Sequence, residues 1–143
     1  MSAGLKVLVV EDSEHDAELL LHELAKAGYK PTARRVDTAA EMDAALGQDA
    51  WDLIISDYVL PQFSGLEALK ILRRRGLDIP FIVVSGKIGE EVAVEALKAG
   101  AHDYLLKDRL TRLPSAIERE LREAAQRRKR READQALRES EER

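Results

Sequence analysis

The stretch DLIISD at residues 52–57 is an apolar run that ends abruptly at a carboxylate, Asp57. A short continuous apolar run, without the alternation of a half-exposed strand, is typical of a strand buried on both faces of a parallel sheet. The runs at 5–10, broken only by Lys6, and at 81–85, FIVVS, have the same character. These three segments predict the centre of a parallel sheet.

Helical segments separate the predicted strands. Their apolar residues recur three and four positions apart, and they occupy residues 16–27, 38–46, 64–72, 89–99 and the chain from about 112 onward. A weaker strand at 32–36 and a short one at 102–106 complete five strand–helix repeats. The predicted N-caps are Ser13, Thr38 and Ser64, and the predicted helix ends are Gly28 and Gly100. Because parallel strands need a crossover, this order predicts an α/β fold, a doubly wound five-stranded parallel sheet with an extended C-terminal helix.

The composition fits one soluble domain with a densely charged appendage. The chain of 143 residues is 45% hydrophobic and 35% charged and contains no cysteine, which excludes disulfides and thiolate metal sites. Its first apolar run is too short for a signal peptide, and no stretch approaches the roughly 20 apolar residues of a membrane span, so we interpret the protein as cytoplasmic. Residues 1–110 carry 13 basic and 19 acidic side chains, whereas residues 111–143 carry 10 and 8. The front part is therefore acidic and the tail nearly balanced.

Polar side chains come directly after the predicted strands at their carboxyl ends, where ligands bind in sheets of this kind. They are Glu11, Asp12, Asp57, Ser85 and Lys107. Each one alone is explained by a turn, a cap or a solvated loop, but their joint occurrence at the ends of four strands favours a site. Three carboxylates that meet would repel one another unless a hard divalent cation such as Mg²⁺ joined them. Lys107 adds a compact positive charge that suits a phosphoryl oxygen.

The stretches KVLVVEDSEHD, DLIISDYVLPQFSGLEAL, PFIVVSG and AGAHDYLLKD resemble the receiver domain of two-component response regulators over roughly residues 4–122. The resemblance implies a flavodoxin-like strand order 2-1-3-4-5 and makes Asp57 the phospho-acceptor. It implies that Mg²⁺ is held by Glu11, Asp12, Asp57 and the backbone carbonyl of Val59. Lys107 matches the lysine of the family.

The same resemblance implies a mechanism and partners. A sensor histidine kinase or a phosphotransfer protein would donate the phosphoryl group from a phosphohistidine. The new phosphoryl would draw Ser85 inward and let Tyr104 rotate, changing the face formed by the fourth helix, the fifth strand and the fifth helix. The domain would be no enzyme in the ordinary sense, since it would catalyse only its own phosphorylation and dephosphorylation.

Two positions depart from the family pattern. Glu11 stands where Asp is commoner; Glu is one methylene longer, and we expect metal binding to survive. Asp108 comes after Lys107 where the family usually has a proline with a cis bond. A cis bond without proline costs about 3–4 kcal/mol, so we expect a trans bond here. We also expect Asp108 to pair with Arg109 or Arg112.

The C-terminal segment carries an apolar seam that fades beyond residue 125, with RRKRR next at 127–131. Basic runs can bind nucleic acid, but this one lacks interleaved aromatic residues and has acidic neighbours at helical spacing, with expected pairs Glu123–Arg127 and Arg128–Glu132. We therefore favour an exposed signalling helix, and we expect a receiver domain at 1–122 and a linker or weak coiled coil at 123–143. The segment ADQALRESEER resembles the helix that leads into a PAS domain, so we expect a PAS, kinase or cyclase module after it. A homodimer through the helix face or the tail stays open.

Three alternative functions make different demands on the sequence. An aspartate-nucleophile Mg²⁺ phosphatase of the haloacid dehalogenase type would need a second Asp two positions after Asp57, where Val59 stands. A flavodoxin-type nucleotide binder would need amide donors after the first strand, but EDSEHD at 11–16 would repel phosphate. A receiver-like module that binds partners without phosphorylation is the remaining alternative.

Overall fold

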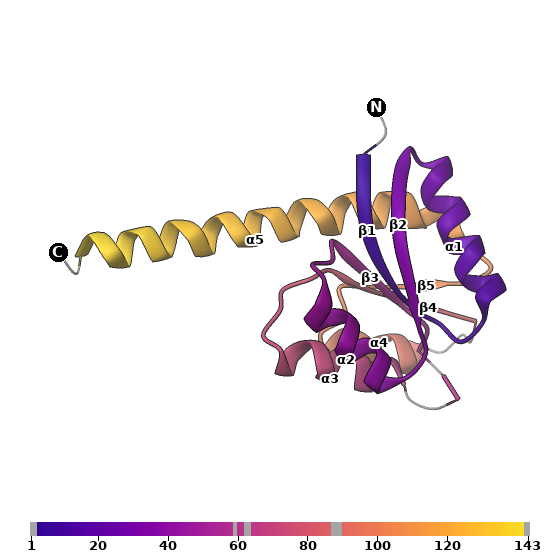
Figure 1. Ribbon diagram of the computed structural model, residues 1–143. Coiled ribbons are helices and arrows are strands. Elements are labelled where there is room, and N and C mark those ends of the chain that lie inside the picture. Colours follow the sequence, from indigo (N-terminus) through magenta and orange to yellow (C-terminus); the bar gives the residue numbers. More distant parts are fainter. Residues whose placement is uncertain (1–2, 59, 62–63, 87–89, 142–143) are drawn as a thin grey trace.

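The computed structural model describes residues 3–58, 60–61, 64–86 and 90–141, in which five strands alternate with five α-helices (Figure 1). The strands are β1 Ala3–Val10, β2 Tyr29–Val36, β3 Leu53–Ser56, β4 Phe81–Ser85 and β5 Asp103–Leu106. The helices are α1 Glu14–Lys26, α2 Ala39–Gln48, α3 Gly65–Arg74, α4 Glu90–Ala99 and α5 Leu113–Glu141, with a short 3₁₀ turn at Leu110–Arg112. Each predicted strand and helix is confirmed, with ends that differ by a few residues.

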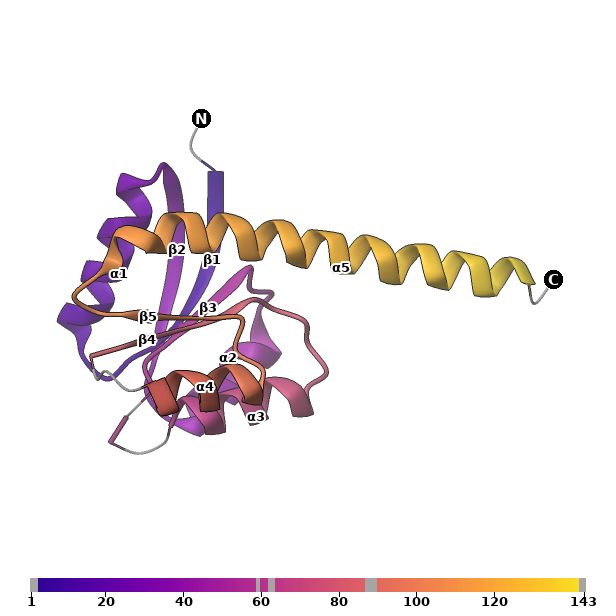
Figure 2. The ribbon, with the colours of Figure 1, turned by 180° about the vertical axis from the view of Figure 1, so that it is seen from behind.

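All strand pairs are parallel, and the order across the sheet is β2-β1-β3-β4-β5. Helices α1 and α5 cover one face, and α2, α3 and α4 cover the other (Figures 1 and 2). The predicted doubly wound, flavodoxin-like sheet is therefore confirmed. In a sheet of this kind the order reverses beside the first strand, and the carboxyl ends on either side of that reversal frame a crevice.

The two layers of core explain why the central strands have no polar alternation. Val7 and Val9 of β1 pack with α1 and α5, whereas Leu8 and Val10 pack with α2 and α3. All residues of β3 and β4 are buried. Since successive side chains point to opposite faces, a strand covered on both sides is apolar except at its carboxyl end, where Ser56 and Ser85 lie. Each fully buried aliphatic side chain contributes about 1.5–3 kcal/mol.

Edge strand β2 is longer than its sequence indicates. It begins at Tyr29, where the prediction began at residue 32, because β1 pairs with it from Ala3↔Tyr29 to Val10↔Val36. Most of its side chains are exposed, so the backbone ladder rather than apolar burial sets its length. Apolar periodicity is a weak signal for such a strand.

Local signals set the helix ends as predicted. The hydroxyls of Ser13, Thr38 and Ser64 each accept a hydrogen bond from a backbone N–H three residues on, at 3.1, 3.1 and 3.2 Å. Such caps are typically worth about 1 kcal/mol each. Gly28 and Gly100 come after α1 and α4 with φ of +97° and +119°, a conformation that side chains with a Cβ rarely adopt.

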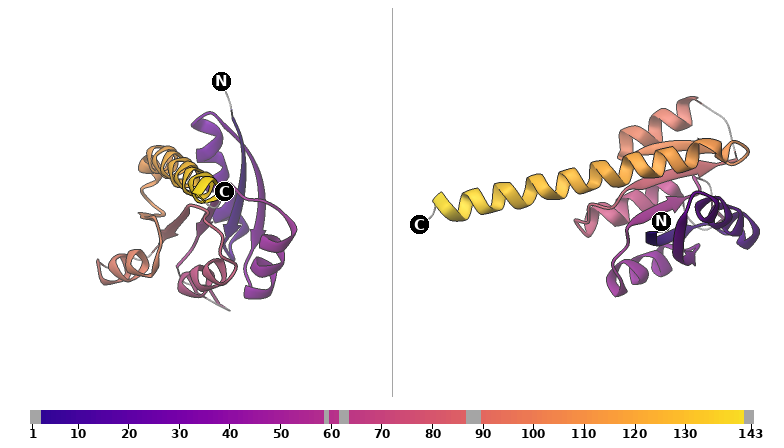
Figure 3. Two further views of the ribbon diagram at one scale, coloured as in Figure 1. Left: turned by 90° about the vertical axis from the view of Figure 1, so that its left-hand side faces the viewer. Right: turned by 90° about the horizontal axis from the view of Figure 1, so that it is seen from above.

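Helix α5 packs on the sheet with its first half and extends beyond the domain with its second (Figure 3). Leu113, Ala116 and Ile117 are buried, whereas every residue from 128 to 141 is exposed. The expected pair Glu123–Arg127 is wrong: the Nε atom of Arg127 lies 3.0 Å from Asp78 Oδ2 in the loop before β4. Within the described part of the chain, no helix has the length and apolar composition needed to cross a membrane.

Candidate functional site: a carboxylate rim around Lys107

Backbone pairing carries the acidic residues to one edge of the sheet. The N–H of Glu11 donates to the carbonyl of Val36 at 2.9 Å, and the N–H of Asp57 donates to the carbonyl of Val10 at 2.9 Å. The ladders thus continue one residue past β1 and β3. Side chains that leave these positions emerge together at the carboxyl edge.

Glu11, Asp12 and Asp57 meet as predicted. Each offers a carboxylate oxygen, and these atoms all lie within 4.8 Å of one another. The Glu11 side chain is only 2% exposed, and its Oε1 accepts a hydrogen bond from the N–H of Ser13 at 3.1 Å. Asp12 is exposed and Asp57 partly buried, so the group is open to solvent on one side.

We call the carboxylates of Glu11, Asp12 and Asp57 at this edge of the sheet the rim. The ammonium of Lys107 lies beside them. Its Nζ is 2.8 Å from Glu11 Oε2 and 3.0 Å from Asp57 Oδ2. The N–H of Lys107 donates to the carbonyl of Ser85 at 3.0 Å, which continues the β4–β5 ladder and aims the side chain across the rim. Strands β1, β3 and β5 therefore each place a charged group at one point.

The charges shift one another's proton affinity. Burial raises the pKa of Glu11 to about 7, although hydrogen bonds from Lys107 and from the Ser13 N–H act in the opposite direction. For Lys107, burial by itself lowers the pKa, but hydrogen bonds to Asp16, Glu11 and Asp57 outweigh it and raise the pKa. Glu11, Asp12 and Asp57 together offer three carboxylates against the single ammonium of Lys107, and such a surplus of acidic groups fits a hard divalent cation.

A fourth carboxylate, Asp16, belongs to the rim, and sequence reasoning missed it. Its Oδ2 lies 2.8 Å from Lys107 Nζ. Asp16 lies in the first turn of α1, where its N–H donates to Ser13 Oγ, so the cap turns its side chain back toward the end of β1. The signal was available: an acidic residue three positions after a predicted N-cap at this edge would face the rim.

The predicted switch residues lie on the neighbouring strands. Ser85 is buried at the carboxyl end of β4, two residues beyond Val83, which pairs with Ser56 of β3. Tyr104 of β5 pairs with Val83 in register and packs, partly buried, against the core on the α2–α4 face. Val59, the predicted source of a carbonyl ligand, lies outside the described residues.

The loop after β5 begins with a trans peptide bond, as expected. In the described part of the chain no peptide bond is cis, including the one between Lys107 and Asp108. The expected pair Asp108–Arg112 is wrong, because Arg112 Nη2 lies 3.4 Å from Asp103 Oδ2, at the start of β5. Asp103 also accepts a hydrogen bond from the N–H of Tyr104 at 2.8 Å.

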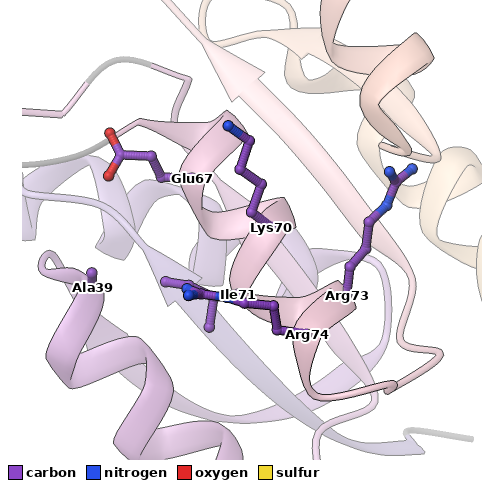
Figure 4. Close-up of a pocket in the computed structure, with 6 residues that line it drawn as sticks. All are labelled: Ala39, Glu67, Lys70, Ile71, Arg73 and Arg74. Carbon is purple, nitrogen blue, oxygen red and sulfur yellow. The ribbon is translucent and has the colours of Figure 1, made fainter.

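A separate groove of about 460 Å³ lies between α2 and α3. Its lining residues are Ala39, Glu67, Lys70, Ile71, Arg73 and Arg74 (Figure 4). In Figure 4 the side chains of Ile71 and Arg74 point toward Ala39 of α2, whereas Arg73 points away from it. None of the rim carboxylates lines this groove, so the charged site and the groove are distinct.

Comparison with known proteins agrees with the fold. A family model described as the response regulator receiver domain matches residues 7–118. The phosphate regulon regulatory protein PhoB of Klebsiella pneumoniae is 36% identical over 107 residues, which cover 71% of this chain and 44% of that protein. The C4-dicarboxylate transport regulatory protein DctD of Pseudomonas aeruginosa is 32% identical over 105 residues, 73% of this chain and 22% of that protein.

Solved structures give the same result. The receiver domain of a Francisella response regulator superposes with a TM-score of 0.72 at 27% identity, covering 83% of this chain and 98% of that domain. The chain belongs to the response regulator receiver domain family. It spans less than half the length of the curated relatives described above, which are transcriptional regulatory proteins by name.

Proposed function

We propose that this receiver domain accepts a phosphoryl group on Asp57 from a phosphohistidine of a sensor histidine kinase or a phosphotransfer protein. One observation carries the proposal: Asp57 Oδ2 lies 3.0 Å from Lys107 Nζ and its carboxylate is within 4.8 Å of the Glu11 and Asp12 carboxylates. Such a site supplies a nucleophile with groups that neutralise an incoming phosphoryl.

The transfer forms one bond to phosphorus and breaks another. A carboxylate oxygen of Asp57 attacks phosphorus in line with the breaking phosphorus–nitrogen bond, whose electron pair returns to the imidazole nitrogen. A proton from solvent on the ring's other nitrogen lets the imidazole leave neutral. The product is an acyl phosphate on Asp57, and hydrolysis later returns phosphate and the free carboxylate.

The residues at the rim have two different roles, metal binding and neutralisation of the phosphoryl charge. Glu11, Asp12, Asp57 and the carbonyl of Val59 would hold Mg²⁺, which when bound neutralises the carboxylates and draws charge from the phosphoryl oxygens. Lys107 pairs with Asp57 before transfer and with a phosphoryl oxygen afterwards. Its ammonium keeps the nucleophile oriented while the donor approaches.

Ser85 and Tyr104 carry the response outward in this proposal. The Ser85 hydroxyl, buried at the end of β4, moves toward the phosphoryl, and Tyr104 moves after it from β5 into the space beside α4. The surface formed by α4, β5 and α5 changes as a result. Receiver domains thus act as switches on partners and catalyse only their own phosphorylation and dephosphorylation.

Helix α5 provides a rigid route by which this switch would reach an output module. We propose a receiver domain at residues 1–122 and a signalling linker at 123–143, because α5 continues without a break from its buried first turns into an exposed second half. A PAS, kinase or cyclase module in the same cytoplasmic protein would receive the signal. A helix that is continuous across the boundary transmits rotation or displacement better than a flexible chain.

Intact mass spectrometry tests the acceptor. The protein is incubated with acetyl phosphate and Mg²⁺ beside two variants, Asp57→Asn at the rim and Asp43→Asn on the exposed face of α2. We expect the wild type and Asp43→Asn to gain the mass of one phosphoryl group and Asp57→Asn to gain none. Absence of uptake by the wild type would favour a phosphorylation-independent module.

A further inference from the structure

Lys107 contacts one carboxylate more than the proposed chemistry uses. Besides Glu11 and Asp57, its Nζ lies 2.8 Å from Asp16 Oδ2, as close as its contact with Glu11 and closer than its contact with Asp57. The other two carboxylates leave the ends of strands, whereas Asp16 comes from α1. The ammonium is therefore held from the helix side as well as from the sheet.

Asp16 lies outside the group that could hold a metal. Among the described residues, the carboxylates that gather within 4.8 Å of one another belong to Glu11, Asp12 and Asp57. Asp16 joins the rim through the Lys107 ammonium. The Asp16 side chain is 34% exposed, against 10% for Asp57, so these two of the three carboxylate partners of Lys107 differ in solvation. Asp16 thus shares the Lys107 ammonium with Asp57 and is not part of the group that could hold a metal.

Asp16 lies on the α1 side of the Lys107 ammonium. A small hollow of about 20 Å³ beside Lys107 is lined by Asp16, Leu19, Leu20 and Leu110. The Asp16 backbone is anchored by its hydrogen bond to Ser13 Oγ and by the first turn of α1. A fixed carboxylate next to a long, flexible lysine side chain can hold the ammonium on the α1 side of the rim.

We propose that Asp16 is a positioning residue that draws Lys107 away from the acceptor and thereby slows phosphorylation of Asp57 and shortens the life of the phospho-form. This inference rests on the proposed function. Two effects slow phosphorylation: Asp16 shares the cation that would otherwise neutralise the phosphoryl, and its own charge repels an anionic donor. The first of these effects also leaves the phosphoryl group of the phospho-form less well neutralised. Both effects disappear when the carboxylate becomes an amide.

Two donors of different charge test the inference. The rate of phosphorylation is measured by intact mass with acetyl phosphate, a dianion at neutral pH, and with phosphoramidate, a monoanion. We expect Asp16→Asn to react about five-fold faster than the wild type with acetyl phosphate, the order expected for removing one partly screened charge. The gain should be smaller with phosphoramidate, and the phospho-form should decay more slowly.

Controls separate a positioning role from a structural one. Asp16→Glu restores the carboxylate and should return the rate toward the wild-type value. Glu18→Gln removes a charge from an exposed position of α1 and should leave both rates unchanged. A change in the packing of α1 would alter the phosphorylation rates with the two donors by the same factor. The proposal would therefore be overturned if Asp16→Asn changed both rates equally, or if its rate were at or below that of the wild type.

The acceptor function and the role of Asp16 fail in different ways. If the wild type takes up no phosphoryl group from either donor, the acceptor function itself is refuted and the role of Asp16 is refuted with it. If the wild type is phosphorylated on Asp57 but Asp16→Asn matches it in rate and in the decay of the phospho-form, only the role of Asp16 is overturned.

Discussion

Replacing Glu11 with Gln should stabilise the metal-free domain at neutral and alkaline pH. The Glu11 side chain is 2% exposed, and burial raises its pKa from 4.5 to about 7. The folded protein therefore binds the proton of Glu11 more tightly than the unfolded chain does. The stability that results is fully present below pH 4.5 and is lost as the pH rises through 7.

The size of the effect depends on the shift. One pKa unit corresponds to about 1.4 kcal/mol, so between pH 5 and pH 8 the wild type should lose roughly 2 kcal/mol of folding free energy through this group. Gln has the same shape and does not titrate. The difference in stability between Glu11→Gln and the wild type should therefore grow by that amount over the same pH interval.

Urea unfolding in the presence of a metal chelator measures this difference at pH 5, 6.5 and 8. Glu14→Gln is the matched control, since Glu14 is exposed in the first turn of α1. Added Mg²⁺ should stabilise the wild type at pH 8 more than Glu11→Gln, because the cation compensates the charge that the variant lacks.

Two results would refute a net cost of burying the Glu11 carboxylate: a Glu11→Gln variant less stable than the wild type at pH 8, or a difference between the two that is the same at pH 5 and pH 8. Either result would mean that Lys107 pairs with Glu11 well enough to offset its burial. A change of equal size in Glu14→Gln would point to the overall charge of the chain instead.

Three further predictions concern other parts of the chain. Asp78→Ala removes the carboxylate that binds Arg127 and Arg131 of α5 at 3.0 and 2.5 Å. Hydrogen exchange should show faster opening of the last packed turns of α5, with little change in β3. Equal protection of α5 in the variant and the wild type would contradict the role of this contact. Gly65→Ala places a Cβ about 3.0 Å from the backbone carbonyl of Asp57, so phosphorylation should slow at least several-fold, and an unchanged rate would show that the loop adjusts freely. Trp51→Phe removes the indole donor to the carbonyl of Ala45 at 3.0 Å, and urea unfolding should show a loss of about 1 kcal/mol; no loss would mean that water replaces the donor.

Much of this molecule is determined by local sequence signals. Apolar runs at 5–10 (broken by Lys6), 53–56 and 81–85 identify the buried strands, because only a strand covered on both faces needs apolar side chains at nearly every position. The caps at Ser13, Thr38 and Ser64 could be predicted for a similar reason, since the bond that each hydroxyl makes spans three residues. The convergence of Glu11, Asp12 and Asp57 could be predicted because parallel strands end at a common edge.

Only the tertiary structure decided which charges pair across long separations. Arg127 pairs with Asp78 rather than with Glu123, and Arg112 pairs with Asp103 rather than with Asp108. Asp16 joins Lys107 across 91 positions of the chain. Long charged side chains reach several neighbours at similar energies, so their partners depend on how the backbone brings distant elements together, whereas strand burial and helix caps depend on a few adjacent residues.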